Sequence, residues 1–128
     1  MRNFARWFLP FSHRVAQVLI VPALALIVWG ELTPSPPNPF QLWDKLLHFM
    51  AYFGLAGLAL VALKPGRRAI YSAITLIILG GVLEIVQGMV GRDASWGDEL
   101  ANTLGVIAGC GLGWGIVRAL ERASRGPA

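Results

Sequence analysis

Four long apolar segments constrain the fold of this chain more than any other feature. They cover about residues 15–30, 46–63, 70–90 and 100–117, and an α-helix needs roughly 20 residues to cross a bilayer. Only 14% of the residues are charged, whereas soluble domains carry about 25%. The segments lack the alternation of polar and apolar residues that a membrane β-barrel requires. We predict an all-α polytopic membrane protein, in which residues 1–128 form a single four-transmembrane-helix bundle.

The basic residues predict the orientation of this bundle. Apart from Lys45 and Arg92, every Lys and Arg lies in residues 1–14, in residues 64–68 or in residues 118–128. The positive-inside rule places such segments in the cytoplasm. We therefore expect an N-in/C-in topology, with a cytoplasmic or interfacial N-terminus (1–14) and a cytoplasmic tail (118–128). This sorting accounts for the net charge of +4, so nucleic acid is not an expected partner.

The third apolar segment carries a carboxylate, Glu84, at membrane depth. Placing a charged side chain there costs about 2.5–3.5 kcal/mol even on the lenient insertion scales. Helical spacing puts Gln87 on the same face toward the outer end and Gly80 below it. We expect Glu84 to be buried and to find partners on other helices.

The second segment supplies one set of such partners. Asp44, His48 and Tyr52 are spaced by four residues, so they share one face of a helix, and Lys45 lies beside them. Asn38, Pro39 and Gln41 form a typical helix start, which places this polar group in the outer half of the helix.

The fourth segment has one polar and small-residue stripe. Asp98 and Asn102 continue into Gly105, Gly109 and Gly113 at steps of three or four residues. Such glycine steps predict close packing on another helix, and they also permit a homo-oligomer. Ser95 together with Asp98 is expected to cap the start of this helix.

The first segment shows little chemistry. It contains Pro22, and we expect no functional side chain beyond Gln17. Residues 1–9 mix arginine with aromatic residues before Pro10, which is typical of one or two interfacial helical turns on the cytoplasmic leaflet. We expect the first helix to be retained as an anchor.

The polar residues of the outer half form one candidate site. Its expected ligand-binding residues are Asp44, Lys45, His48, Tyr52, Glu84, Gln87, Arg92, Asp98 and Asn102. Arg92 fits an anionic ligand because guanidinium binds phosphate or carboxylate bidentately, and it also fits an ion pair with Asp93 or Asp98.

Glu84 and His48 are the candidates for acid-base catalysis or proton transfer, and structural pairing is the alternative for both. His48 with Asp44, Glu84 and Asp98 could also assemble a metal site. A single histidine without a local ligand motif is poor evidence for one, so we expect no metal and no cofactor.

These motifs together resemble the VanZ-like family of small polytopic membrane proteins. The similarity covers about residues 44–113 and is carried by DKLLHFMAYF from Asp44, EIVQ from Glu84, Gly91-Arg92, and DELANTLG from Asp98. The resemblance implies a bacterial cytoplasmic (inner) membrane protein of the cell envelope, linked through the family's namesake to resistance to the glycopeptide teicoplanin. It implies no established catalytic mechanism.

The preferred hypothesis is a binding protein rather than an enzyme. It places an anionic lipid or a lipid-linked wall precursor in a polar pocket at the outer face, where Arg92 and Lys45 meet the anion. One alternative is an intramembrane enzyme that acts on a lipid-linked substrate with Glu84 or His48 as acid-base group. Another is a small proton-coupled carrier, which four helices accommodate only with difficulty unless the chain oligomerises.

Overall fold

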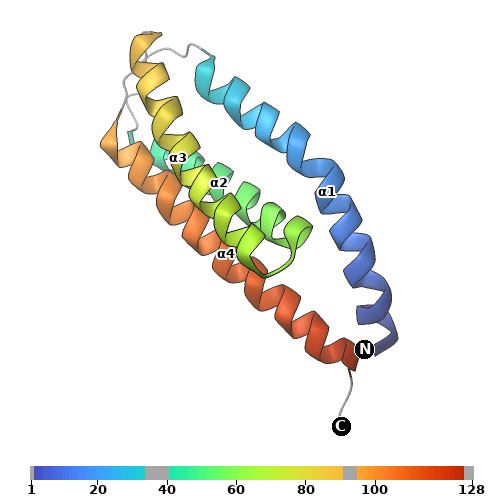
Figure 1. Cartoon of the computed structure of the whole chain (residues 1–128). Coiled ribbons are helices and arrows are strands. Elements are labelled where there is room, and N and C mark those ends of the chain that lie inside the picture. Colours follow the sequence, from blue (N-terminus) through green and yellow to red (C-terminus); the bar gives the residue numbers. More distant parts are fainter. Residues whose placement is uncertain (1, 34–40, 91–94, 126–128) are drawn as a thin grey trace.

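The computed structural model describes residues 2–33, 41–90 and 95–125. It consists of four α-helices, α1 (Arg2–Leu32), α2 (Gln41–Leu63), α3 (Arg67–Met89) and α4 (Trp96–Arg125), as Figure 1 shows. All four are long and apolar enough to cross a membrane. The prediction of an all-α four-helix membrane bundle is confirmed. Asn38 and Pro39, which were expected to start the second helix, lie outside the described residues.

Helix α1 is longer than its apolar segment predicted. Its 31 residues run through Pro10 and Pro22 without interruption, and at 1.5 Å per residue they span about 46 Å. The structure therefore shows one continuous helix where a separate interfacial turn before Pro10 was expected. A proline removes one backbone hydrogen bond, and near a helix end in the head-group layer water can satisfy the freed carbonyl.

The closest helix pair is α2 with α4, and the glycine stripe of α4 makes this contact. A Cβ atom added at Gly105 or Gly109 would press on the backbone of Phe49 and Phe53 in α2. The predicted close packing of this stripe is confirmed. Because α2 of the same chain covers these glycines, the stripe is not the open surface that a homo-oligomer through it would need.

The remaining surfaces show how the bundle meets its surroundings. Helix α1 packs mainly on α2, and the start of α1 lies at the same end of the bundle as the end of α4 (Figure 1). Large apolar side chains such as Val18, Ile78, Ile85 and Ile107 are exposed around the bundle. An apolar outer surface on helices of this length belongs in lipid, so the chain is a multi-pass integral membrane protein.

The turn between α2 and α3 contains a backbone conformation that favours glycine. Lys64 follows the last residue of α2 with a φ of 62°, in the left-handed region that costs a side-chain-bearing residue about 1–2 kcal/mol. We expect Lys64→Gly to raise the free energy of unfolding by about 0.5–1 kcal/mol, because glycine removes this strain but adds freedom to the unfolded chain. Unfolding of the purified protein in mixed detergent micelles measures the change, and an unchanged or lower stability would contradict the expectation.

Candidate functional site

All four helices contribute buried polar residues to one end of the bundle, opposite the α2–α3 turn. This group, here called the polar cluster, comprises the end of α1, the first turns of α2, the last turns of α3 and the first turns of α4. Its buried polar members are Glu31, His48, Glu84, Gln87, Asp98 and Asn102. Ionisable residues inside a transmembrane bundle are rare and are by default candidates for a functional site.

His48 lies at the centre of the polar cluster. Its Nδ1 atom is 3.2 Å from Oδ1 of Asn102 and 3.8 Å from Oε1 of both Glu31 and Glu84. An amide oxygen only accepts hydrogen bonds, so the contact with Asn102 assigns a hydrogen atom to Nδ1 of His48. Helices α1, α3 and α4 thus each present an oxygen atom to the same nitrogen of α2.

Glu84 connects α3 to the start of α4. Its Oε2 accepts a hydrogen bond of 3.1 Å from the backbone N–H of Ser95. Ser95 in turn accepts the backbone N–H of Gly97 at its Oγ, at 3.1 Å, which satisfies one free donor at the start of α4. The predicted cap by Ser95 is confirmed, but its second half comes from Glu84 of α3 and not from Asp98.

Gly80 makes room for this arrangement one turn below Glu84. A Cβ atom there would lie 2.7 Å from Oε2 of Glu99 and 3.2 Å from Nδ2 of Asn102. The small-residue face of α3 that the sequence predicted therefore admits two polar side chains from α4.

Asp98 pairs with the lysine at the rim of the polar cluster. Lys45 Nζ lies 3.3 Å from Asp98 Oδ1, and the two side chains are 34% and 4% exposed. This distance is long for a charge-assisted hydrogen bond. Because the Lys45 side chain is partly exposed and only loosely paired with Asp98, a ligand at the surface can reach its ammonium group.

The end of α1 is the part of the site that the sequence did not predict. Glu31 is buried against His48, and its backbone carbonyl accepts a 2.9 Å hydrogen bond from Nε2 of Gln87. The sequence placed no residue of the first helix in the candidate site, and the structure adds Glu31 to it. The sequence holds one signal for this residue, because Glu31 is a carboxylate directly after the last apolar residues of the segment.

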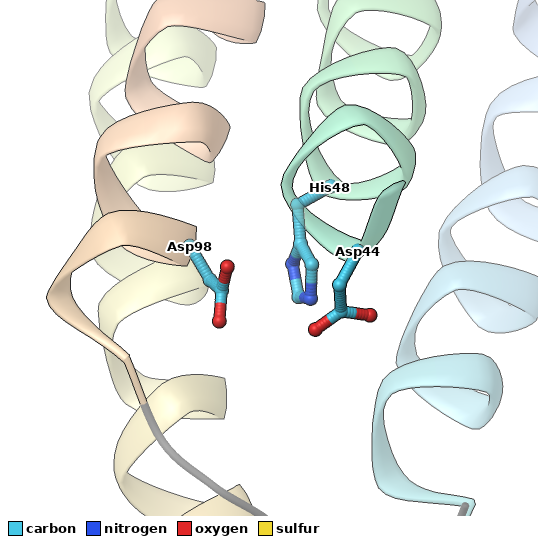
Figure 2. A group of neighbouring side chains, drawn as sticks. All are labelled: Asp44, His48 and Asp98. Atoms are coloured by element: carbon cyan, nitrogen blue, oxygen red, sulfur yellow. The ribbon is translucent and has the colours of Figure 1, made fainter. Parts of the chain in front are cut away.

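Three potential metal ligands, one of which is His48, lie together in the polar cluster. One ligand atom from each of Asp44, His48 and Asp98 lies within 4.8 Å of the other two. Figure 2 shows the imidazole of His48 between the two carboxylates, with Asp44 on the same helix and Asp98 on α4. Tyr52, one turn further along α2, is fully buried.

The structure therefore brings together the predicted site residues that it describes, and Arg92 lies outside the described residues. A cavity of about 300 Å³ opens beside them between α1 and α2, lined in part by Glu31, Asp44 and His48. No protein-family profile, curated protein or solved structure matches the chain.

Proposed function

We propose that this chain is a cell-envelope protein of the bacterial cytoplasmic membrane that binds an anionic lipid or a lipid-linked wall precursor. The observation that carries the proposal is the burial of ionisable side chains from all four helices at one end of an apolar bundle, beside an open cavity. Holding carboxylates at that depth is costly, and a ligand-binding role offers a reason to retain them.

The shape of the polar end suits a lipid head group. The cavity of about 300 Å³ lies between α1 and α2 and has both polar and apolar lining residues, among them Asp44, His48, Ile27 and Leu47. Small-molecule sites begin at about this volume. A lipid in the surrounding leaflet would enter sideways, with its acyl chain along the apolar flank and its head group toward Lys45.

The distribution of charge supports an orientation with the polar cluster at the outer face. Described basic residues gather toward the opposite end, at the start of α1, around the α2–α3 turn and at the end of α4; they include Arg6, Arg14, Arg67 and Arg118. Under the positive-inside rule that end is cytoplasmic, which gives the N-in/C-in topology.

We also propose membership of the VanZ-like family. The residues that carry the resemblance lie on α2, α3 and α4, and the described ones converge on the polar cluster, as His48, Glu84 and Asn102 do. A role in resistance to teicoplanin-type glycopeptides follows from this membership and is part of the same proposal.

The two lysines of the chain provide the test. Lys45 lies at the rim of the polar cluster, and Lys64 lies at the opposite end, after α2. We expect Lys45→Met to weaken binding of a phosphatidylglycerol head group by about tenfold, because a charge-assisted hydrogen bond contributes about 1.5–3 kcal/mol. Native mass spectrometry of the purified protein with phosphatidylglycerol and with zwitterionic phosphatidylethanolamine measures the binding.

The matched control, Lys64→Met, should retain the binding of the parent protein. Binding that is equal for the anionic and the zwitterionic lipid, or equally reduced by both lysine substitutions, would contradict a specific anion site at the polar cluster. The same comparison with a purified undecaprenyl-linked wall precursor separates a general lipid site from a precursor site.

A further inference from the structure

We infer that Asp44, His48 and Asp98 form a binding site for a divalent transition-metal cation such as Zn²⁺ or Mn²⁺. One ligand atom of each residue lies within 4.8 Å of the others, a spacing that a cation with bonds of about 2.0–2.2 Å can bridge after small side-chain rotations. Figure 2 shows that the ligands come from two helices, so the site also joins α2 to α4.

His48 is held in the form that a metal requires. Its Nδ1–H donates to Asn102 Oδ1 at 3.2 Å, which leaves Nε2 as the ring nitrogen that can bind a metal. Metal-binding histidines characteristically donate their other ring N–H to a carbonyl or carboxylate oxygen, which fixes the ring and raises its basicity. Asn102 fills that role, and the two carboxylates at 3.8 Å from Nδ1 strengthen it electrostatically.

A second observation is the oxygen atom Oε1 of Glu84. Glu84 is only 7% exposed, and its Oε1 has no hydrogen-bond partner among the described residues, although it points at His48 from a distance of 3.8 Å. A buried carboxylate oxygen without a partner is costly. A cation bound at Nε2 of His48 would make the Nδ1–H group more positive. This would lower the free-energy cost of burying Oε1 of Glu84.

The ligand set indicates the class of metal. One imidazole nitrogen with two carboxylates suits Zn²⁺ or Mn²⁺, whereas Ca²⁺ and Mg²⁺ prefer oxygen ligands alone. Zn²⁺ takes three protein ligands and one open position in many catalytic and ligand-binding sites. Asp44 and His48 also line the cavity between α1 and α2, so a ligand in that cavity would lie next to a cation held by these residues.

Lys45 competes with the cation. Its ammonium group lies 3.3 Å from Asp98 Oδ1, so a metal bound by Asp98 must displace it. Replacing Lys45 with methionine should therefore tighten metal binding. If the lipid site proposed above exists, the displaced lysine becomes available to a head group, and only this last step rests on the proposed function.

The experiment uses the purified full-length protein in detergent, freed of metal with a chelator, and Zn²⁺ or Mn²⁺ alone as the probe. Isothermal titration with Zn²⁺ and electron paramagnetic resonance with Mn²⁺ measure affinity without any lipid ligand. Mutation of a residue that only supports a metal ligand typically weakens binding about 10–100-fold, so we expect His48→Gln and Asp44→Asn, which change the ligands themselves, to cause at least a loss of that order. Lys45→Met should tighten binding severalfold. Asp44 is partly exposed, so Asp44→Asn should fold. The free energy of unfolding of this variant, measured without metal and compared with that of the parent protein, checks this.

Two matched controls complete the design. His13→Gln changes the other histidine of the chain, which lies on α1 and contacts Val61, and Glu99→Gln changes a neighbouring acid outside the ligand set. Both should bind the metal as the parent does. Absence of binding by the parent, binding that survives His48→Gln and Asp44→Asn, or an equal loss in His13→Gln would overturn the metal site without affecting the lipid proposal.

Discussion

Replacing Gly109 with leucine is expected to separate α4 from α2 and to cause the largest loss of stability of any single substitution considered. A Cβ atom at Gly109 would already collide with the backbone of Phe53, and a backbone cannot move aside as a flexible side chain can. We expect the free energy of unfolding to fall by at least about 3 kcal/mol, since overpacking at a rigid contact ranks among the most damaging changes.

The same helix provides the control for this effect. Gly111 lies two residues further on, and no described atom beyond its own helical turn lies within 4 Å of the position of an added Cβ. Gly111→Leu should change stability by no more than about 0.5 kcal/mol. Unfolding by sodium dodecyl sulfate in mixed micelles, followed by tryptophan fluorescence, measures both variants. Equal effects of the two substitutions would show that Gly109 does not face α2.

His48→Leu is expected to have the second largest effect, measured without metal. The imidazole N–H lies between the Asn102 oxygen and the carboxylates of Glu31 and Glu84. Leucine fills a similar volume but offers no donor, so the buried carboxylates lose the polar group that separates them. Removing one partner from a buried polar network costs about 3–5 kcal/mol, and we expect a loss toward the lower value.

A double substitution tests this explanation. Glu84→Gln removes one negative charge while its amide oxygen can still accept the Ser95 N–H. Added to His48→Leu, it should recover at least about 1 kcal/mol, because the two changes act on one network and are not additive. His13→Leu, at the other end of the bundle, loses contacts to Val61 and Gln17 and should cost only about 1 kcal/mol. Simple additivity of the first pair would argue against a shared network.

The charge balance links the two proposed ligands of the polar cluster. Among its described side chains the acids outnumber the single lysine, Lys45; these acids are Glu31, Asp44, Glu84, Asp98 and Glu99. A divalent cation would offset this surplus of acids, and a cation with an open position can in turn bind phosphate. Titration with the metal alone and mass spectrometry with the lipid alone would give independent results for the two ligands.

The sequence determined the number of helices and, for three of them, which face is polar or glycine-rich and packs inside the bundle. Apolar segments of membrane-spanning length predicted four helices, and a single carboxylate at membrane depth predicted that Glu84 would be buried with partners. Steps of three and four residues also predicted that Gly105 and Gly109 would pack closely on another helix. These properties follow from the helical repeat and from the cost of charge in lipid, both of which act within one helix.

Only the tertiary structure decided which helices meet and which polar atoms face one another. Periodicity could not show that the glycine stripe of α4 packs on α2, or that Asp98 pairs with Lys45 and not with its own helix start. The apolar pattern also gave no sign of Glu31, because the pattern stops at the last apolar residue. The helix α1 continues past that point and brings Glu31 to His48. The helical repeat fixes which residues share a face, but the packing of four helices sets the distances between faces.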